Sequence, residues 1–145
     1  MIYNEQPKDF IPDIEVVSCL IEFKNKILLL HRNDNKIEGN KWGPPGGKVD
    51  KSDLDIKKAV IREIKEETGL SLDENNINFH KTFYLEHQEF NYLYHYFHYN
   101  ISEISDIILS ENEHKAYTWE TPEDALEMSL VTDEDYCLKD YYGIK

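Results

Sequence analysis

A chain of 145 residues is long enough for one domain with a sizeable core and too short for two ordinary domains. Its net charge of −13 argues against binding to a nucleic-acid backbone, which favours basic surfaces. No apolar run approaches the roughly 20 residues of a membrane span, and the N-terminus lacks the apolar core of a signal peptide, so we expect a cytoplasmic protein with no membrane partner. Cys19 and Cys137 have no paired spacing, and we interpret them as reduced packing residues.

The first segments predict an N-terminal arm followed by a β-hairpin. Residues 1–12 are mostly polar and end at a proline, which favours a loosely held arm. The β-branched and apolar run Ile14–Phe23 predicts a strand, and a short polar turn leads into a second, mostly buried strand, Ile27–His31. Arg32 follows at the end of that strand. Both a substrate-binding arginine and an ordinary surface arginine fit this position.

The most informative stretch is Gly46–Leu70, a glycine turn followed by a helix. Apolar residues recur at helical spacing from about Leu54 until Gly69, a residue typical of the position after a helix. Three glutamates crowd one side of the helix at spacings where like charges repel: Glu63, Glu66 and Glu67. Glu67 also lies on the stripe that would otherwise pack inward. A hard divalent cation, Mg²⁺ or Mn²⁺, would turn this repulsion into coordination, whereas the alternative is a solvated acidic face.

The rest of the chain predicts a second hairpin, a short strand and two helices. Ile77–His87 and Tyr92–Ile101 form the hairpin, and the aromatic residues of its second strand cover both faces. Lys115–Glu120 is the short strand. Thr121 to about Met128 forms a helix with proline at its first position, and Thr132 caps a terminal helix that ends at about Tyr141.

The stretch Gly46–Leu70 resembles the signature box of the Nudix hydrolases, G-x5-E-x7-R-E-U-x-E-E-x-G-U, in which U is a bulky aliphatic residue. Eight of its nine specified positions match: Gly47, Arg62, Glu63, Ile64, Glu66, Glu67, Gly69 and Leu70. At the ninth, Asp53 replaces the Glu of the family, and eight residues rather than seven separate it from Arg62. We predict that Asp53 still pairs with Arg62, because a looser first helical turn can absorb one residue, and that the bond orients Glu63.

The resemblance implies an α/β fold, an α/β/α sandwich with a mixed β-sheet, for residues 1–145 as one domain. It also implies Mg²⁺-dependent hydrolysis of a pyrophosphate bond in a nucleotide, and the favoured substrate is a nucleoside triphosphate in normal or oxidised form, as in MutT-like members. The alternatives are a dinucleoside polyphosphate or ADP-ribose hydrolase and a non-catalytic nucleotide-binding sensor. We expect a monomer or homodimer whose partner is a small-molecule nucleotide.

The resemblance also implies site residues. Four form the metal site: Gly47, Glu63, Glu66 and Glu67. Four are catalytic, and one of the three carboxylates is the general base: Arg62, Glu63, Glu66 and Glu113. Four bind substrate: Arg32, Lys48, Asp133 and Asp135. The last two would read a purine edge, although helix capping explains them equally well. We expect the base to lie between Arg32, the aromatic hairpin near Tyr84 and Tyr96, and the start of the terminal helix.

Overall fold

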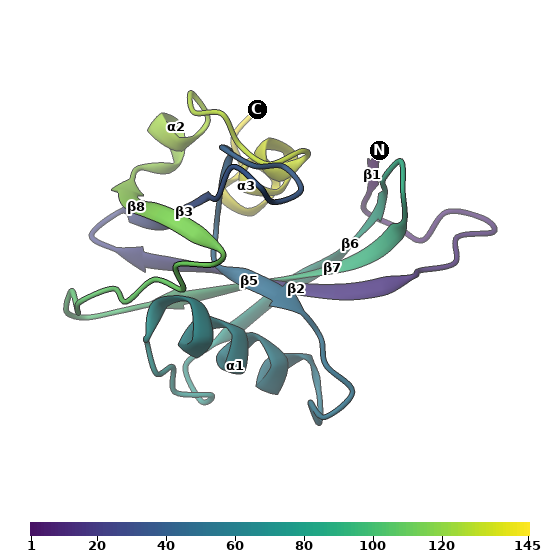
Figure 1. The fold of residues 1–145 in the computed structure, drawn as a ribbon. Coiled ribbons are helices and arrows are strands. Elements are labelled where there is room, and N and C mark those ends of the chain that lie inside the picture. The colour runs from purple at the N-terminus through teal and green to yellow at the C-terminus, as the bar shows by residue number, and fades with distance from the viewer.

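The computed structural model describes residues 1–145 as a mixed β-sheet with helices on both faces (Figure 1). The strands are β1 (Ile2–Tyr3), β2 (Ile14–Phe23), β3 (Lys26–Arg32), β4 (Trp42–Gly43), β5 (Gly46–Lys48), β6 (Asn78–Glu86), β7 (Asn91–Asn100) and β8 (His114–Glu120). The helices are α1 (Ile56–Thr68), α2 (Pro122–Ala125) and α3 (Glu134–Tyr142). Helix α1 covers one face and α2 and α3 lie on the other, which confirms the α/β/α sandwich. No helix is both long and apolar enough to cross a membrane.

The two strands of the first hairpin diverge, and this divergence creates the cleft of the molecule. The sheet order is β1-β6-β7-β2-β3-β4, with β7 parallel to β2 and the remaining pairs antiparallel. Strands β2 and β3 pair only beside their turn, where Glu22–Phe23 meets Lys26–Ile27. Further along, β5 pairs with β2 while β8 and β4 pair with β3. The cleft therefore opens where the two strands separate.

Each face of the sheet has its own hydrophobic core. The core under α1 includes Val17, Cys19, Ile21, Leu28, Leu30, Val60, Ile64 and Phe97. The core under α2 and α3 includes Leu20, Ile27, Leu29, Phe83, Tyr94, Tyr96, Cys137 and Leu138. The alternation predicted for β7 is confirmed, because Tyr94 and Tyr96 lie in one core and Phe97 in the other. Both cysteines are free and buried, each in a different core.

Helix α1 begins slightly later than predicted. Leu54 is 87% exposed and lies outside the helix, which starts at Ile56. Asp55 is the N-cap, and its side chain accepts a hydrogen bond of 2.8 Å from the backbone N–H of Lys58. Gly69 adopts a φ of 80° and ends the helix, as predicted.

The two C-terminal helices differ from the prediction. Helix α2 ends at Ala125 rather than near Met128, because the N–H groups of Glu127 and Met128 bond three residues back and tighten the chain into a turn. Thr132 is not the N-cap of α3. Asp133 occupies that position with a φ of 68° and makes no capping bond. Thr132 instead donates both its backbone N–H and its hydroxyl to Glu38 in the loop after β3, which competes for it more effectively than the helix end does.

The expectation of a loosely held N-terminal arm is wrong for its first residues and for Phe10. Strand β1 pairs with Tyr84–Leu85 of β6, and the Met1 amino group donates a 2.8 Å hydrogen bond to the carbonyl of Glu86. Phe10 is 6% exposed and packs edge to face on Tyr84 with ring centroids 5.6 Å apart. The arm therefore closes the outer edge of the sheet.

Candidate active site

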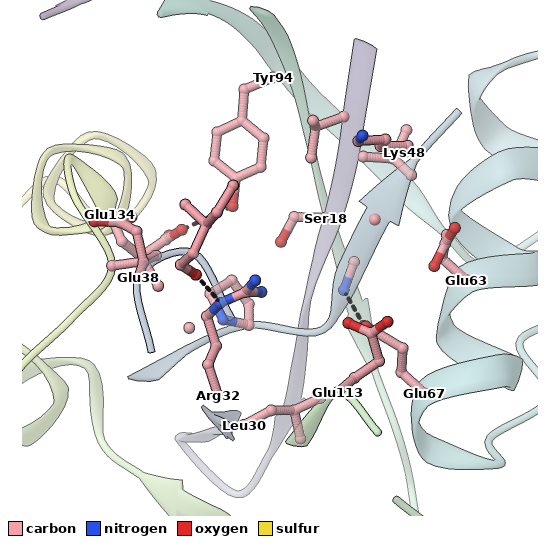
Figure 2. A pocket seen from close by; sticks show the side chains of 18 of the residues that line it. Ser18, Leu30, Arg32, Glu38, Lys48, Glu63, Glu67, Tyr94, Glu113 and Glu134 are labelled. Atoms are coloured by element: carbon pink, nitrogen blue, oxygen red, sulfur yellow. Dashed lines mark hydrogen bonds between the residues drawn. The ribbon is translucent and has the colours of Figure 1, made fainter. Parts of the chain in front are cut away.

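A cavity of about 610 Å³ lies between the diverging strands and extends from α1 to the start of α3. Figure 2 shows Glu63, Glu67 and Glu113 at one end, Glu134 at the other, and Arg32 between them. The predicted site residues that line it are Arg32, Gly47, Lys48, Glu63, Glu66, Glu67 and Glu113. Arg62, Asp133 and Asp135 do not line it.

The glycine turn packs directly on the carboxylates of α1. A Cβ atom on Gly46 would lie 2.1 Å from the carbonyl oxygen of Val17, and one on Gly47 would lie 2.3 Å from a carboxylate oxygen of Glu63. Gly46 therefore requires glycine because it meets backbone, whereas a side chain at Gly47 would displace the carboxylate of Glu63. The N–H of Gly46 donates to Glu67 Oε1 at 2.7 Å, so β5 and the helix hold each other in place.

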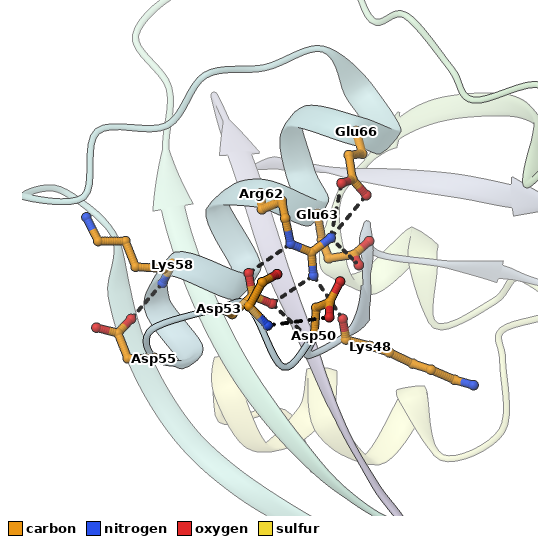
Figure 3. Close-up of polar contacts among 9 residues, drawn as sticks. Lys48, Asp50, Asp53, Asp55, Lys58, Arg62, Glu63 and Glu66 are labelled. Atoms are coloured by element: carbon orange, nitrogen blue, oxygen red, sulfur yellow. Dashed lines mark hydrogen bonds and ion pairs between the residues drawn. The ribbon is translucent and has the colours of Figure 1, made fainter.

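The predicted pairing of Asp53 with Arg62 is confirmed (Figure 3). Arg62 donates from Nε and Nη2 to the two oxygens of Asp53, both at 2.9 Å, and from Nη2 to the carbonyl of Lys48 at 3.1 Å. Its Nη1 reaches Glu63 at 3.0 Å and Glu66 at 3.1 Å. The hydrogen bonds from this guanidinium hold the pKa of Asp53 below its usual value. Arg62 thus orients two glutamates from outside the cavity.

Glu67 is the most deeply buried of the three box glutamates, with 7% exposure, and no lysine or arginine pairs with it. Burial raises its pKa to about 8, and the negative charges of Glu63 and Glu113 add to the effect. Its Oε2 lies 3.8 Å from Nδ1 of His114, a buried nitrogen with no hydrogen-bond partner. Burial lowers the pKa of His114 to about 4.

These observations fit a divalent cation. A buried carboxylate without a cationic partner is costly, and the carboxylate oxygens of Glu63 and Glu66 line the same end of the cavity, although no three acidic or histidine side chains already surround one point. Carboxylate and backbone oxygens are the ligands that Mg²⁺ and Mn²⁺ take in proteins. Glu63, Glu66, Glu67 and Gly47 are the residues that would hold the ion.

The far end of the cavity contains a carboxyl group that the sequence analysis missed. Glu134, the first residue of α3, is 1% exposed and accepts hydrogen bonds from the hydroxyl groups of Tyr94, at 2.7 Å, and Tyr96. Burial raises its pKa to about 7, against the effect of these two hydrogen bonds. A carboxyl group near its pKa at neutral pH can both donate and accept hydrogen bonds.

The two acidic neighbours of Glu134 lie elsewhere. Neither Asp133 nor Asp135 lines the cavity, and the carboxylate of Asp133 lies 3.9 Å from the amino group of Met1. The capping interpretation fails for Asp133 too, because its side chain makes no cap bond. The N-cap of helix α3 is Asp133 rather than Thr132, so the helix starts one residue later than predicted. This later start directs Glu134 inward. The run of three acidic residues in the sequence indicated that this segment could carry a functional carboxylate, but it did not indicate which of the three is buried.

The aromatic wall of the cavity also differs from the prediction. Tyr84 packs on Phe10, Tyr96 is fully buried, and neither lines the cavity, whereas Phe90, Tyr92 and Tyr94 do. These three belong to the end of the second hairpin that approaches the divergence of β2 and β3. An apolar aromatic wall beside one buried carboxyl group is typical of a site that binds a flat, polar-edged ring.

Arg32 is held at the middle of the cavity. Its Nε donates to the carbonyl of Ile37 at 2.8 Å, and its terminal nitrogens make no hydrogen bond within the protein. Glu38, next in the same loop, ties the loop to the start of α3 through Thr132. The guanidinium therefore has a fixed direction and free donors, which suits a phosphate ligand.

Comparisons with known proteins agree with this geometry. The family model of the NUDIX domain matches residues 12–141. The CTP pyrophosphohydrolase of Escherichia coli K12 is 30% identical over 120 residues, 81% of this chain and 83% of that protein. An ADP-ribose pyrophosphatase of Methanocaldococcus jannaschii is 48% identical over 54 residues, 37% of this chain and 31% of that protein. The crystal structure of a MutT protein from Methanosarcina mazei Go1 superposes with a TM-score of 0.76 at 29% identity, covering 90% of this chain and 92% of that one. The chain therefore belongs to the NUDIX family, as a hydrolase that acts on pyrophosphate bonds.

Proposed function

We propose that the protein is a nucleoside triphosphate pyrophosphohydrolase that requires Mg²⁺ or Mn²⁺. The observation that carries this proposal is one cavity with a carboxylate cluster at Glu63, Glu66 and Glu67 and an aromatic-walled carboxyl group, Glu134, at its other end. The carboxylate cluster suits a pyrophosphate with its cation, and the aromatic-walled end with Glu134 suits the nucleobase. The E. coli relative, a CTP pyrophosphohydrolase, acts on a substrate of this class.

The chain's own residues divide the work between them. A divalent cation held by Glu63, Glu66, Glu67 and Gly47 would supply a Lewis acid for the pyrophosphate and would lower the pKa of a nearby water. Glu67 is held by the Gly46 N–H, while Arg62 orients Glu63 and Glu66. Arg32 and Lys48 line the cavity with donors for phosphate oxygens.

Glu113 is the general base in this proposal. Glu63 and Glu66 both accept hydrogen bonds from Arg62, which makes their oxygens less available to a proton. Glu113 lines the same cavity and has one ion pair, with Lys36 at 3.6 Å. Its carboxylate is therefore the freest of the three to accept the proton of the attacking water.

The runner-up substrate is ADP-ribose. The M. jannaschii relative supports it, since that ADP-ribose pyrophosphatase is 48% identical over 54 residues. A cavity of about 610 Å³ is within the usual range for one small ligand, which favours a mononucleotide over a dinucleoside polyphosphate. The alternative of a non-catalytic nucleotide-binding sensor is inconsistent with the assignment of the chain as a hydrolase.

A nucleotide panel tests the substrate and the metal together. The four ribonucleoside triphosphates, 8-oxo-GTP, ADP-ribose and a dinucleoside tetraphosphate are incubated with Mg²⁺, with Mn²⁺, or with excess chelator. We expect triphosphates to give a monophosphate and pyrophosphate, chelation to abolish the reaction, and added Mg²⁺ to restore it. Hydrolysis that persists in chelator would refute the metal requirement. A higher kcat/KM for ADP-ribose would establish the runner-up.

The variant Glu134→Gln tests whether Glu134 recognises the nucleobase of the substrate. We expect it to change the ratio of kcat/KM between purine and pyrimidine triphosphates by about tenfold, the effect of one hydrogen bond of roughly 1.4 kcal/mol. Because the pKa of Glu134 is about 7, the wild-type ratio should also change between pH 6 and 8, and that of the variant should not. Asp135→Asn is the matched control, since Asp135 lies outside the cavity. If wild type and Glu134→Gln had equal purine-to-pyrimidine ratios of kcat/KM at every pH, the nucleobase would be recognised by other residues.

A further inference from the structure

The imidazole of His114 is the one buried polar side chain that lacks a partner. The ring is 5% exposed, and its Nδ1 makes no hydrogen bond. The other two buried histidines are satisfied, since His95 bonds Glu15 at 3.0 Å and His98 bonds Glu22 at 2.9 Å. A buried nitrogen without a partner costs free energy, so a native chain retains one where a further group completes it.

A β-bulge directs this ring into the cleft. Strand β8 pairs with β3 in regular register up to His31 opposite Ala116, and the next pair is Arg32 opposite His114. Lys115 is skipped. Since side chains alternate along a strand, regular pairing would have placed Lys115 opposite Arg32 and turned the His114 ring to the opposite face. The bulge exchanges the two, which is how bulges re-aim side chains beside functional sites.

The ring meets the buried carboxylate of Glu67. One oxygen of that carboxylate, Oε1, has a fixed donor in the N–H of Gly46 at 2.7 Å. The other, Oε2, has no hydrogen bond and lies 3.8 Å from Nδ1 of His114. An approach of about 0.9 Å would give an ordinary N–H···O hydrogen bond. The unpaired nitrogen and the unpaired oxygen thus face each other.

We propose that His114 is a positioning residue for Glu67, whose Oε2 accepts a hydrogen bond from Nδ1–H of His114 when the divalent cation is bound. The carboxylate is then held at both oxygens, by Gly46 and by His114, and its remaining lone pairs are directed to the ion. Such outer partners fix the orientation of metal ligands and raise their affinity. The proposal rests on the metal site of the proposed function and adds a residue to it.

Two substitutions separate the hydrogen bond from the volume of the ring. His114→Asn places an amide nitrogen near the position of Nδ1, and His114→Phe keeps a ring without nitrogen. Mn²⁺ affinity is measured by electron paramagnetic resonance of the free ion, without substrate. We expect His114→Phe to bind Mn²⁺ about 10- to 100-fold more weakly than wild type and His114→Asn to recover most of the loss. His80→Phe is the control, because His80 pairs with Asp140 of α3, on the other side of the sheet, and should leave the affinity unchanged.

The tautomer of His114 gives a second readout that needs no substitution. Long-range ¹H–¹⁵N spectra of the Mg²⁺-loaded protein should show the proton on Nδ1. A proton on Nε2, nitrogen coupling to bound Mn²⁺ that reveals direct ligation, or wild-type affinity in folded His114→Phe would each overturn the proposal. Wild-type protein that binds no Mn²⁺ would refute the metal site and the proposed function as well, so the two failures are distinguishable.

Discussion

The variant Glu67→Gln should lose at least about a hundredfold in kcat/KM and bind Mn²⁺ far more weakly than wild type, because in the proposed metal site it removes the charge of a ligand and not only an outer partner. The same variant should be more stable than wild type in chelator at alkaline pH. The pKa of Glu67 is about 8 in the fold and near 4.5 in the unfolded chain. A raised acid pKa stabilises the fold below pH 4.5, and that stability is lost as the pH rises to 8. The loss is at most about 1.4 kcal/mol per pH unit, and glutamine does not undergo it.

Activity assays, Mn²⁺ titration and thermal unfolding in chelator at pH 5 and pH 8.5 check this result together. Glu74→Gln is the matched control, since the side chain of Glu74 is exposed and forms its one ion pair with Lys58 at the surface. It should leave all three quantities near their wild-type values. An active Glu67→Gln enzyme, or one that gains no stability over wild type at pH 8.5, would contradict the assignment of Glu67 as a buried metal ligand.

Arg62→Lys should lower kcat about 10- to 100-fold while the fold is retained, because a lysine cannot replace the planar fork that holds Asp53, Glu63 and Glu66 at once. The loss is one of orientation, since Arg62 does not line the cavity. Steady-state kinetics at saturating Mg²⁺ measure it.

Asp53→Asn provides the matched test of the same network. If Asp53 acts through Arg62, the double variant should be little worse than Arg62→Lys alone, because residues of one hydrogen-bond network are not additive. Full additivity of the two losses would show that Asp53 and Arg62 act independently, in spite of their two hydrogen bonds of 2.9 Å.

Sequence pattern alone determined the features that depend on neighbours in the chain. Helical spacing and Gly69 located α1, and the same spacing gathered Glu63, Glu66 and Glu67 on one side of it. The pairing of Asp53 with Arg62 was implied by the resemblance to the Nudix signature box, and it could be transferred because both residues belong to one short loop-helix unit. The period of two along β7 assigned its aromatic side chains to the two cores. Side-chain periodicity is a local property, so it can be read from order along the chain.

Only the tertiary structure decided the features that depend on distant segments. Thr132 bonds Glu38 from the loop after β3 instead of capping α3, and the later start of that helix turns Glu134 toward the cavity. A bulge between β3 and β8 turns His114 toward Glu67. The bulge arises from the pairing of the two strands and cannot be recognised in the sequence of either strand alone. A shift of one residue moves a side chain to the other face of a strand or by about 100° around a helix. Contacts between distant segments set that shift, and local periodicity therefore cannot determine it.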